Sequence, residues 1–365
     1  MRRGHPAVLR SRLSRHVGSL RCVGRPSVEL LRMLAERMPH LRELEGVYLE
    51  CHPTVAGSAL LRFPAQLRTL RLDFVSAVGD DFGDADAALE LPPGAVEAIA
   101  QLPQLTELRL AGDGGGLPPL LTALAQRADS QLRSLDLSAL NDSLPTDALP
   151  ALSQMVQLHE LMPTQSFSWS ALLQPGHRMQ LRTIRAHASQ ADCAALATLP
   201  TLTDVTLHVE GAVPDASFFS ALPLLQRLQV ERSRDPPIGA AFVSAALCHC
   251  EHLTHLGLSR AFLPPSITDC FQRMAQLRTL LLRYCRGMAS LAFLASTPGS
   301  SSLTHLLLLD CVPRLPVSEL VHLRQLRALQ SLELYHVFER ETTAEEKADF
   351  HPSRLLPALQ QLGWR

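Results

Sequence analysis

Lysine is almost absent from this 365-residue chain, and aromatic residues make up only 5% of it. Lys347 is the single lysine, so nearly all of the 34 basic residues are arginine. Neither sign of charge dominates, because the formal net charge is −1. A neutral chain has no overall electrostatic attraction to nucleic acid or to an anionic membrane. No apolar run approaches the roughly 18 residues of a membrane span, and we expect no nucleic-acid or membrane partner.

A secretory signal is also missing from the sequence. The eight cysteines have irregular spacings, and no hydrophobic signal-peptide core precedes them. A disulfide framework of a secreted protein is therefore not indicated. Reduced, partly buried thiols are typical of intracellular proteins, so we predict a cytoplasmic location, with the nucleus as an alternative.

Sequence motifs of enzymes are lacking as well. The chain contains no G-x-S-x-G, H-E-x-x-H or C-x-x-C motif, and no nucleophile stands beside a base that is recognisable from sequence. The glycines at 112 and 114–116 do not complete a dinucleotide-binding or phosphate-binding loop. We predict no catalytic residue, no cofactor and no enzymatic activity.

Cys248, His249, Cys250, His252 and His255 form the densest group of metal-type ligands. Zinc sites commonly use two pairs of ligands that a longer spacer separates, and this group has no such spacing. The group therefore gives no predicted metal site, and a metal-binding protein or an enzyme is kept only as a minor alternative.

What the sequence does contain is a repeat. The segment LRTLLLRYC begins at Leu277, and LTHLLLLDC begins at Leu303, 26 residues later. Both place leucine at the first, fourth and sixth positions and cysteine at the ninth, Cys285 and Cys311. The same apolar template recurs along the chain, with its first leucine at residues 41, 67, 105, 132, 158, 181, 202, 225, 253, 277, 303 and 329. The usual period is about 25 residues, which is typical of leucine-rich repeats. In the copy at Leu41, Gly46 takes the third apolar place.

Prolines support this register independently. An apolar residue and then proline stand just before the first leucine in four copies, at Met38-Pro39, Leu102-Pro103, Leu199-Pro200 and Leu222-Pro223. Proline disfavours helix in the residue before it. Each unit is therefore predicted to contain a strand, a turn and a helix that ends before the next strand.

The chain resembles the leucine-rich repeat family, and in its repeat length the cysteine-containing and ribonuclease-inhibitor-like members, including the repeat part of F-box proteins. The resemblance implies an α/β fold, a right-handed solenoid or horseshoe with a concave parallel β-sheet and convex helices. We place the repeat domain at residues 29–365, with an acidic insertion at 76–94 and a charged insertion at 339–349. Residues 1–28 are a basic segment, interpreted as a degenerate first repeat, with a mitochondrial targeting peptide as the lesser alternative.

Side chains on the predicted concave face are the candidate partner-binding residues. Strand residues alternate in direction, so the leucines of the template face the core and the residues between them face outward. A basic patch and an apolar contact point are predicted there. The candidates are Arg182, Arg185, His187, His208, Arg227, Arg278, Arg283, Leu281, Leu307 and Leu309.

The resemblance and the polar face together predict a non-catalytic scaffold that recognises another protein through its concave surface. A substrate-recognition subunit of a ubiquitin ligase, bound to a ligase adaptor, is the alternative. Such a receptor would carry an F-box ahead of the repeats, and no convincing F-box precedes Leu41.

Overall fold

The computed structural model describes residues 17–22, 28–51, 62–76, 93–112, 117–141, 144–187, 189–295, 302–338 and 361–364. Most of the basic segment 1–28, nearly all of the acidic insertion 76–94 and the charged insertion 339–349 lie outside these residues. The chain divides into two compact units, Met1–Leu181 and Arg182–Arg365, called unit 1 and unit 2 below.

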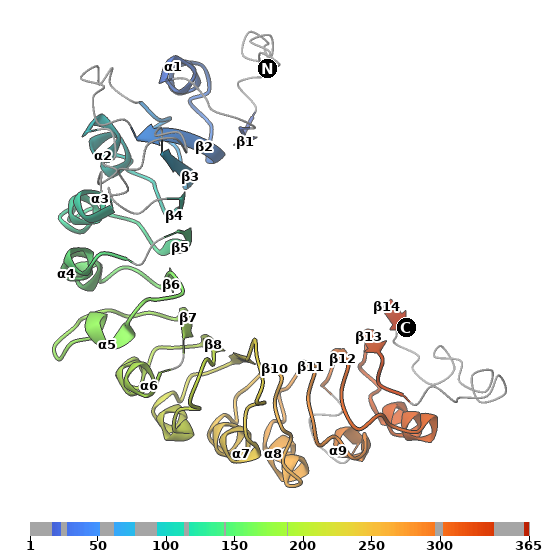
Figure 1. The fold of residues 1–365 in the computed structure, drawn as a ribbon. Helices are drawn as coiled ribbons and strands as arrows, with labels where there is room; N and C mark the ends of the chain where they lie inside the picture. The colour runs from blue at the N-terminus through green and yellow to red at the C-terminus, as the bar shows by residue number, and fades with distance from the viewer. Residues whose placement is uncertain are drawn as a thin grey trace. The chain divides into compact units, whose positions relative to one another are not determined.

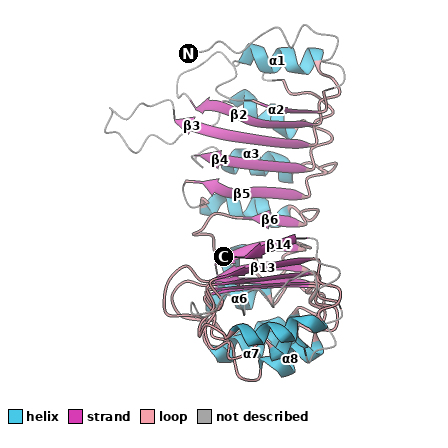
Figure 2. Ribbon diagram, turned by 90° about the vertical axis from the view of Figure 1, so that its right-hand side faces the viewer, coloured by secondary structure: helices cyan, strands magenta, loops and turns pink. Residues whose placement is uncertain are grey.

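Unit 1 is a row of parallel strands backed by short helices (Figure 2). Neighbouring strands along the chain pair with each other in sequence order. The strands are β1 (Ser19–Arg21), β2 (Glu43–Cys51), β3 (Thr69–Ser76), β4 (Glu107–Gly112), β5 (Ser134–Leu140) and β6 (Glu160–Met162). The helices are α1 (Val28–Arg37), α2 (Pro93–Ala100), α3 (Leu117–Ala125), η3 (Thr146–Ala148), α4 (Leu149–Gln154) and α5 (Trp169–Leu172).

Unit 2 has the same construction with shorter strands, and its helices lie on the opposite side from the row of strands (Figure 1). The strands are β7 (Thr183–His187), β8 (Asp204–His208), β9 (Arg227–Glu231), β10 (His255–Ser259), β11 (Thr279–Arg283), β12 (His305–Leu309), β13 (Ser331–Tyr335) and β14 (Gln361–Trp364). The helices are α6 (Gln190–Leu196), η4 (Ala216–Ala221), α7 (Ala240–His249), α8 (Ile267–Arg273), α9 (Ala292–Ala295) and η6 (Val317–Gln325).

The core of each unit consists of ladders of leucine at the template positions. Leu280, Leu306 and Leu332 pair in register on neighbouring strands and are at most 2% exposed. Every first leucine of the template, from Leu41 to Leu329, is at most 4% exposed. Full burial of one such side chain contributes about 1.5–3 kcal/mol. The predicted repeat register and the α/β solenoid fold are confirmed.

Cysteine at the ninth position closes the turn that follows the strand. The Cys285 thiol donates to the Leu258 carbonyl oxygen at 3.5 Å, and the Cys311 thiol donates to the Leu282 carbonyl oxygen at 3.7 Å. Both cysteines are fully buried. A small thiol with a weak donor suits this place because it fills apolar space and contacts a carbonyl of the preceding repeat.

The prediction that Gly46 fills a core position is wrong. The strand pairing shifts between Leu44 and Val47, and Val47 is the fully buried residue. Gly46 has a φ of 70°, and a Cβ there would lie 2.5 Å from the Cys22 carbonyl oxygen. Glycine is required because the backbone bulges in a left-handed conformation against its neighbour.

The prolines act as the sequence predicts. α1 ends at Arg37, before Met38-Pro39, and α6 ends at Leu196, before Leu199-Pro200. The remaining two dipeptides likewise follow α2 and η4. Each helix therefore stops in time for the chain to turn toward the next strand. None of the helices in the described ranges is long and apolar enough to cross a membrane.

Candidate partner-binding surface

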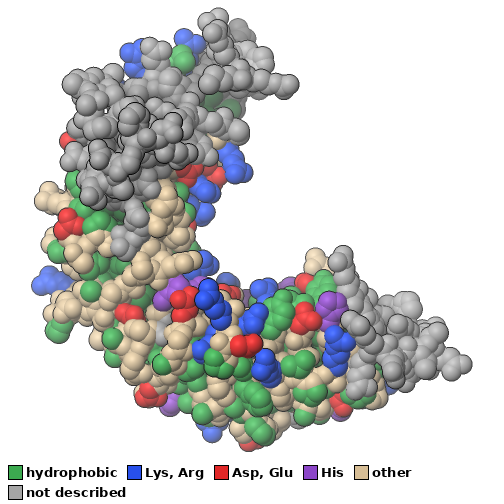
Figure 3. Space-filling view, in the orientation of Figure 1, with side chains coloured by type: hydrophobic (Ala, Val, Ile, Leu, Met, Phe, Trp, Pro, Cys, Tyr) green, Lys and Arg blue, Asp and Glu red, His purple; other side chains and the backbone are tan. Residues whose placement is uncertain are grey.

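The sheet of unit 2 presents one side to its helices and leaves the other side, here called the open face, exposed. Along β7 the burial alternates, so that Thr183, Arg185 and His187 lie on the open face while Ile184 and Ala186 are buried. The alternation follows from the two-residue period of a strand. In Figure 3, basic and histidine side chains lie along the upper edge of unit 2 with some acidic side chains among them, and this face is seen edge-on there.

All ten predicted partner-binding residues belong to unit 2. Arg182 and Arg278 immediately precede β7 and β11, and the other eight lie within β7, β8, β9, β11 and β12. The placements are Arg185 and His187 on β7, His208 on β8, Arg227 on β9, Leu281 and Arg283 on β11, and Leu307 and Leu309 on β12. Their role in binding stays a prediction.

Two of these residues form a stacked pair. The rings of His187 and His208 lie 5.4 Å apart with an interplanar angle of 25°. His208 Nδ1 is 3.2 Å from a carboxylate oxygen of Glu231, and the Gln229 amide donates to the other oxygen. Burial lowers the pKa of His208, while Glu231 opposes the shift. At neutral pH the ring is therefore mainly uncharged.

A second group, here called the basic row, consists of Arg227, His255, Arg278 and His305. Strand pairing places His255 opposite both Arg227 and Thr279, and Thr279 opposite His305. Burial lowers the pKa of His255, and the nearby Arg227, His305 and Arg278 lower it further. His255 and His305 were not among the predicted site residues. Both histidines occupy the same position in their strands as Arg227 does in β9, and this shared position is the sequence signal that identifies them.

The arginines of the open face have no carboxylate partner among the described residues. Within the described ranges, the guanidinium groups of Arg182, Arg185, Arg227, Arg278 and Arg283 make no ion pair and no hydrogen bond. All five are exposed. Guanidinium groups in this state can bind carboxylates or phosphates of another molecule without first breaking an internal ion pair.

Beside the basic row lies an apolar shelf, formed by Leu281, Leu307 and Leu309. Leu281 pairs with Leu307, and Leu309 pairs with Arg283 and Tyr335. All three leucines are half-buried, although they occupy open-face positions. Neighbouring apolar groups on an otherwise polar face are typical of a contact site for a partner.

Because Gly257 has no side chain, the open face is lower at this residue than at the neighbouring apolar shelf. Gly257 occupies the open-face position of β10 that Leu281 occupies on β11. A Cβ at Gly257 would lie 3.1 Å from Gln229 Cγ. The glutamine side chain therefore covers the glycine and borders the shelf.

The loops after β10 to β13 form a second exposed cluster with positive φ at four equivalent non-glycine residues, Arg260, Tyr284, Asp310 and His336. Arg260 stacks on the Tyr284 ring at 5.3 Å, and His336 Nδ1 lies 3.0 Å from Asp310 Oδ1. Phe262, Tyr284 and Val312 are each 43% exposed. The charged groups of this cluster already have partners, in contrast to the arginines of the open face.

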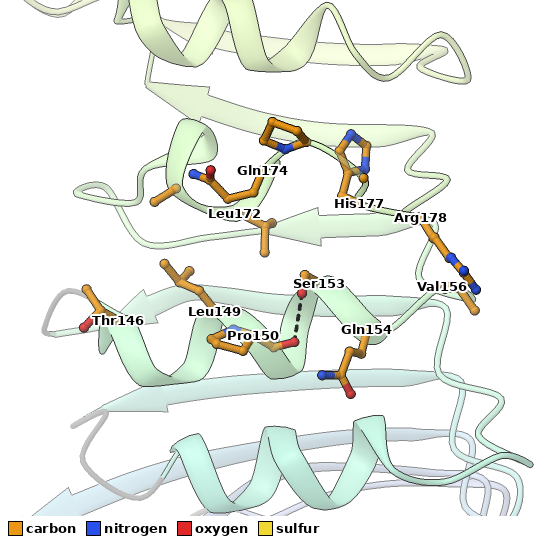
Figure 4. Close-up of a pocket in the computed structure, with 13 residues that line it drawn as sticks. Thr146, Leu149, Pro150, Ser153, Gln154, Val156, Leu172, Gln174, His177 and Arg178 are labelled. Carbon is orange, nitrogen blue, oxygen red and sulfur yellow. Dashed lines mark hydrogen bonds between the residues drawn. The ribbon is translucent and has the colours of Figure 1, made fainter.

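A groove of about 690 Å³ lies on the helical side of unit 1, between α4 and the segment that follows α5 (Figure 4). Leu149, Pro150 and Leu172 supply apolar surface, and His177 and Arg178 lie at its rim. The Ser153 hydroxyl donates to the Pro150 carbonyl oxygen at 2.8 Å. The lining residues that the structure describes include no carboxylate or thiol, so they offer no acid to pair with His177 in general acid–base chemistry.

The cysteine and histidine group gives no metal centre within the described ranges. Cys248 is exposed near the end of α7, Cys250 is buried after that helix, and His255 lies on β10. No set of three or more Cys, His, Asp or Glu residues there is arranged to hold a metal ion. The group is divided because the chain passes from a helix into a core strand between its members.

A chain of the mouse RP105/MD-1 complex is similar in structure, with a TM-score of 0.50 and 14% identity over 94% of this chain and 66% of that chain. This chain has a leucine-rich repeat fold. A leucine-rich repeat protein of Leptospira interrogans matches with a TM-score of 0.44 and 14% identity, over 97% of both chains. A chain of the Drosophila Toll–Spatzle complex matches with a TM-score of 0.43 and 14% identity, over 95% of this chain and 54% of that one.

No model of a protein family matches the sequence of this chain, and no curated protein does. The chain spans between half and two thirds of the length of the matched chains of the RP105/MD-1 and Toll–Spatzle complexes. At this identity the comparisons show the fold, and the cysteine-containing or ribonuclease-inhibitor-like subtype stays a prediction.

Proposed function

We propose that this leucine-rich repeat protein is a non-catalytic scaffold that recognises another protein through the open face of unit 2. The observation that carries the proposal is the set of exposed arginines without described carboxylate partners, next to the half-buried leucines of the shelf. An interface with an apolar centre and a polar, charged surround has this composition. The mouse chain with the same fold was solved as part of a protein complex, which supports the proposal by analogy.

The test is proximity labelling with the full-length protein in its native cells, comparing wild type with an Arg182→Glu/Arg185→Glu variant. Both arginines are exposed, so charge reversal should leave the fold intact. We expect the variant to lose most of the labelling of the true partner, since complementary charges guide association and like charges oppose it.

An Arg324→Glu/Arg327→Glu variant is the matched control, because these two arginines are exposed at and after η6, away from the strands. It changes the net charge equally and should label the partner as wild type does. Equal labelling by all three proteins would contradict a binding role for the open face.

The ubiquitin-ligase receptor is the second prediction for the same scaffold. It rests on the length of the cysteine-containing repeats, with Cys285 and Cys311 as the residues that fit the pattern. Recovery of a ligase adaptor in the same labelling experiment would support it, and recovery of one unrelated complex without an adaptor would count against it.

A further inference from the structure

We propose that the partner presents an acidic segment to the open face of unit 2, with an aliphatic side chain among its carboxylates. This inference rests on the proposed function, because it names the class of partner that the same face binds. The groups that carry it are the basic row, Arg185 and Arg283, and the apolar shelf.

The first step concerns charge. On the unit 1 sheet, two of the outward-facing arginines have acids beside them: Arg71 Nε is 3.8 Å from Asp73 Oδ1, and Arg109 Nε donates to Glu107 Oε1 at 2.7 Å. On unit 2, by contrast, Arg185, Arg227 and Arg283 have no described carboxylate within ion-pair distance. A partner with carboxylates supplies the charge that unit 2 lacks.

The second step concerns spacing. Neighbouring strands lie about 4.8 Å apart, so the basic row extends over roughly 14 Å from β9 to β12. Recognition of a single phosphate needs several donors that converge on one point. The basic row instead spreads its donors, two of them arginines, along a line. This arrangement matches carboxylates along an extended segment of chain, in which successive residues on one side are about 6.8 Å apart.

The third step concerns the distance between the basic row and the apolar shelf. His305 and Leu307 are open-face residues of one strand, two positions and therefore about 6.8 Å apart. A short segment can place a carboxylate on His305 and an aliphatic side chain on Leu307 at the same time. The Leu281 side chain on β11 extends the apolar contact sideways.

Single-stranded nucleic acid is the competing polyanion, and the face suits it less. Proteins that bind single strands stack bases on aromatic side chains in a basic groove. Among the open-face side chains that the structure describes in unit 2, Tyr335 is the one Phe, Tyr or Trp residue. The apolar surface beside the basic row is aliphatic, which fits leucine, isoleucine or valine of a protein.

The experiment is a selection of random 12-residue peptides displayed on phage against the immobilised full-length protein. The strongest peptide is then synthesised with a fluorescent label and titrated by anisotropy. We expect the selected peptides to be enriched in Asp and Glu around an aliphatic residue. Replacing their acids with Asn and Gln should weaken binding at least tenfold, and salt should weaken it because exposed charges are screened.

Variants then locate the site. Arg227→Glu/Arg278→Glu should weaken the peptide at least tenfold, whereas Leu281→Ser/Leu307→Ser should weaken it severalfold without changing its salt dependence. Arg324→Glu/Arg327→Glu should bind as wild type does. Each variant is first checked for the wild-type circular dichroism spectrum and melting temperature, so that a loss of binding is not a loss of fold.

Three outcomes overturn the proposal: a selection that enriches no acidic peptide, peptide binding that survives Arg227→Glu/Arg278→Glu, or tighter binding of a uridine-rich RNA 12-mer at the same residues. If none of the peptides is acidic but Arg182→Glu/Arg185→Glu still abolishes partner labelling, the proposed function stands and only the acidic class of partner fails.

Discussion

The two units share one core design but differ in the charged side chains on the side of the sheet that faces away from the helices. In unit 1 the acids at these strand positions, which are Glu43, Glu45, Asp73, Glu107, Asp136 and Glu160, outnumber the arginines, which are Arg21, Arg71 and Arg109. In unit 2 arginine and histidine outnumber the acids, which are Asp204, Glu231 and Glu333. The leucine template therefore determines the fold, and the residues between the leucines are free to determine recognition.

The largest effect should come from the part that the units share. Leu108 on β4 and Leu280 on β11 occupy the same template position, and both are 0% exposed. Leu108→Ala and Leu280→Ala should each lower the free energy of unfolding by about 2–5 kcal/mol, because lost burial adds to the cost of a cavity. Hydrogen exchange measured by mass spectrometry should show faster exchange in the strands of the altered unit.

The volume-conserving variants Leu108→Met and Leu280→Met are the controls, and each should cost less than about 1.5 kcal/mol. A much smaller loss for one alanine variant than for the other would show that the two cores are not equivalent. The comparison between the units would then involve packing as well as charge.

A smaller effect should follow from the histidines of unit 2. The folded pKa values of His208 and His255 lie below the ordinary value, first because of burial. The unfolded chain therefore takes up protons more readily as pH falls, so both residues favour folding above pH 6.5 and that contribution is lost as pH falls through their folded pKa values. The urea midpoint should decrease from pH 7.5 to pH 5.5.

Binding of the selected acidic peptide should change in the opposite direction, since protonated histidines add positive charge to the open face. A His208→Gln/His255→Gln variant should lose part of both pH effects. If the variant and the wild type have the same pH profiles for stability and binding, the two histidines are not the source of either pH effect.

The fold could be predicted from sequence because its signal is periodic. Buried apolar residues at the first, fourth and sixth template positions are readable without any knowledge of contacts, and the structure confirms the buried first leucines from Leu41 to Leu329. The register failed at Gly46, where a bulge moves Val47 into the core. A bulge depends on the backbone of the neighbouring strand, at Cys22, which a one-dimensional pattern does not contain.

The candidate site was only partly predictable for the same reason. Alternation places Arg185 and His187 on the open face, but it does not say which arginines have acids within reach. Arg109 and Arg227 both lie on outward strand positions, yet only Arg109 has an acid two residues before it on the same strand. The repeat template places His187 and His208 at equivalent positions on neighbouring strands, but it does not give the stacked geometry of their rings.

The smallest predicted effect concerns the ion pair between Arg109 and Glu107 on the sheet of unit 1. Arg109 Nη2 lies 2.6 Å from Glu107 Oε1, and the hydrogen bond that Arg109 donates to Glu107 raises the pKa of Arg109. Both side chains are partly exposed, so solvent screens the pair, and Glu107→Gln should lower the free energy of unfolding by less than about 1 kcal/mol. A double-mutant cycle with Arg109→Gln, measured by urea denaturation, isolates the energy of the pair.

Binding of the selected acidic peptide to the Glu107→Gln variant should stay unchanged, because unit 1 gains a free arginine but no apolar shelf. Tighter binding would show that charge alone is sufficient.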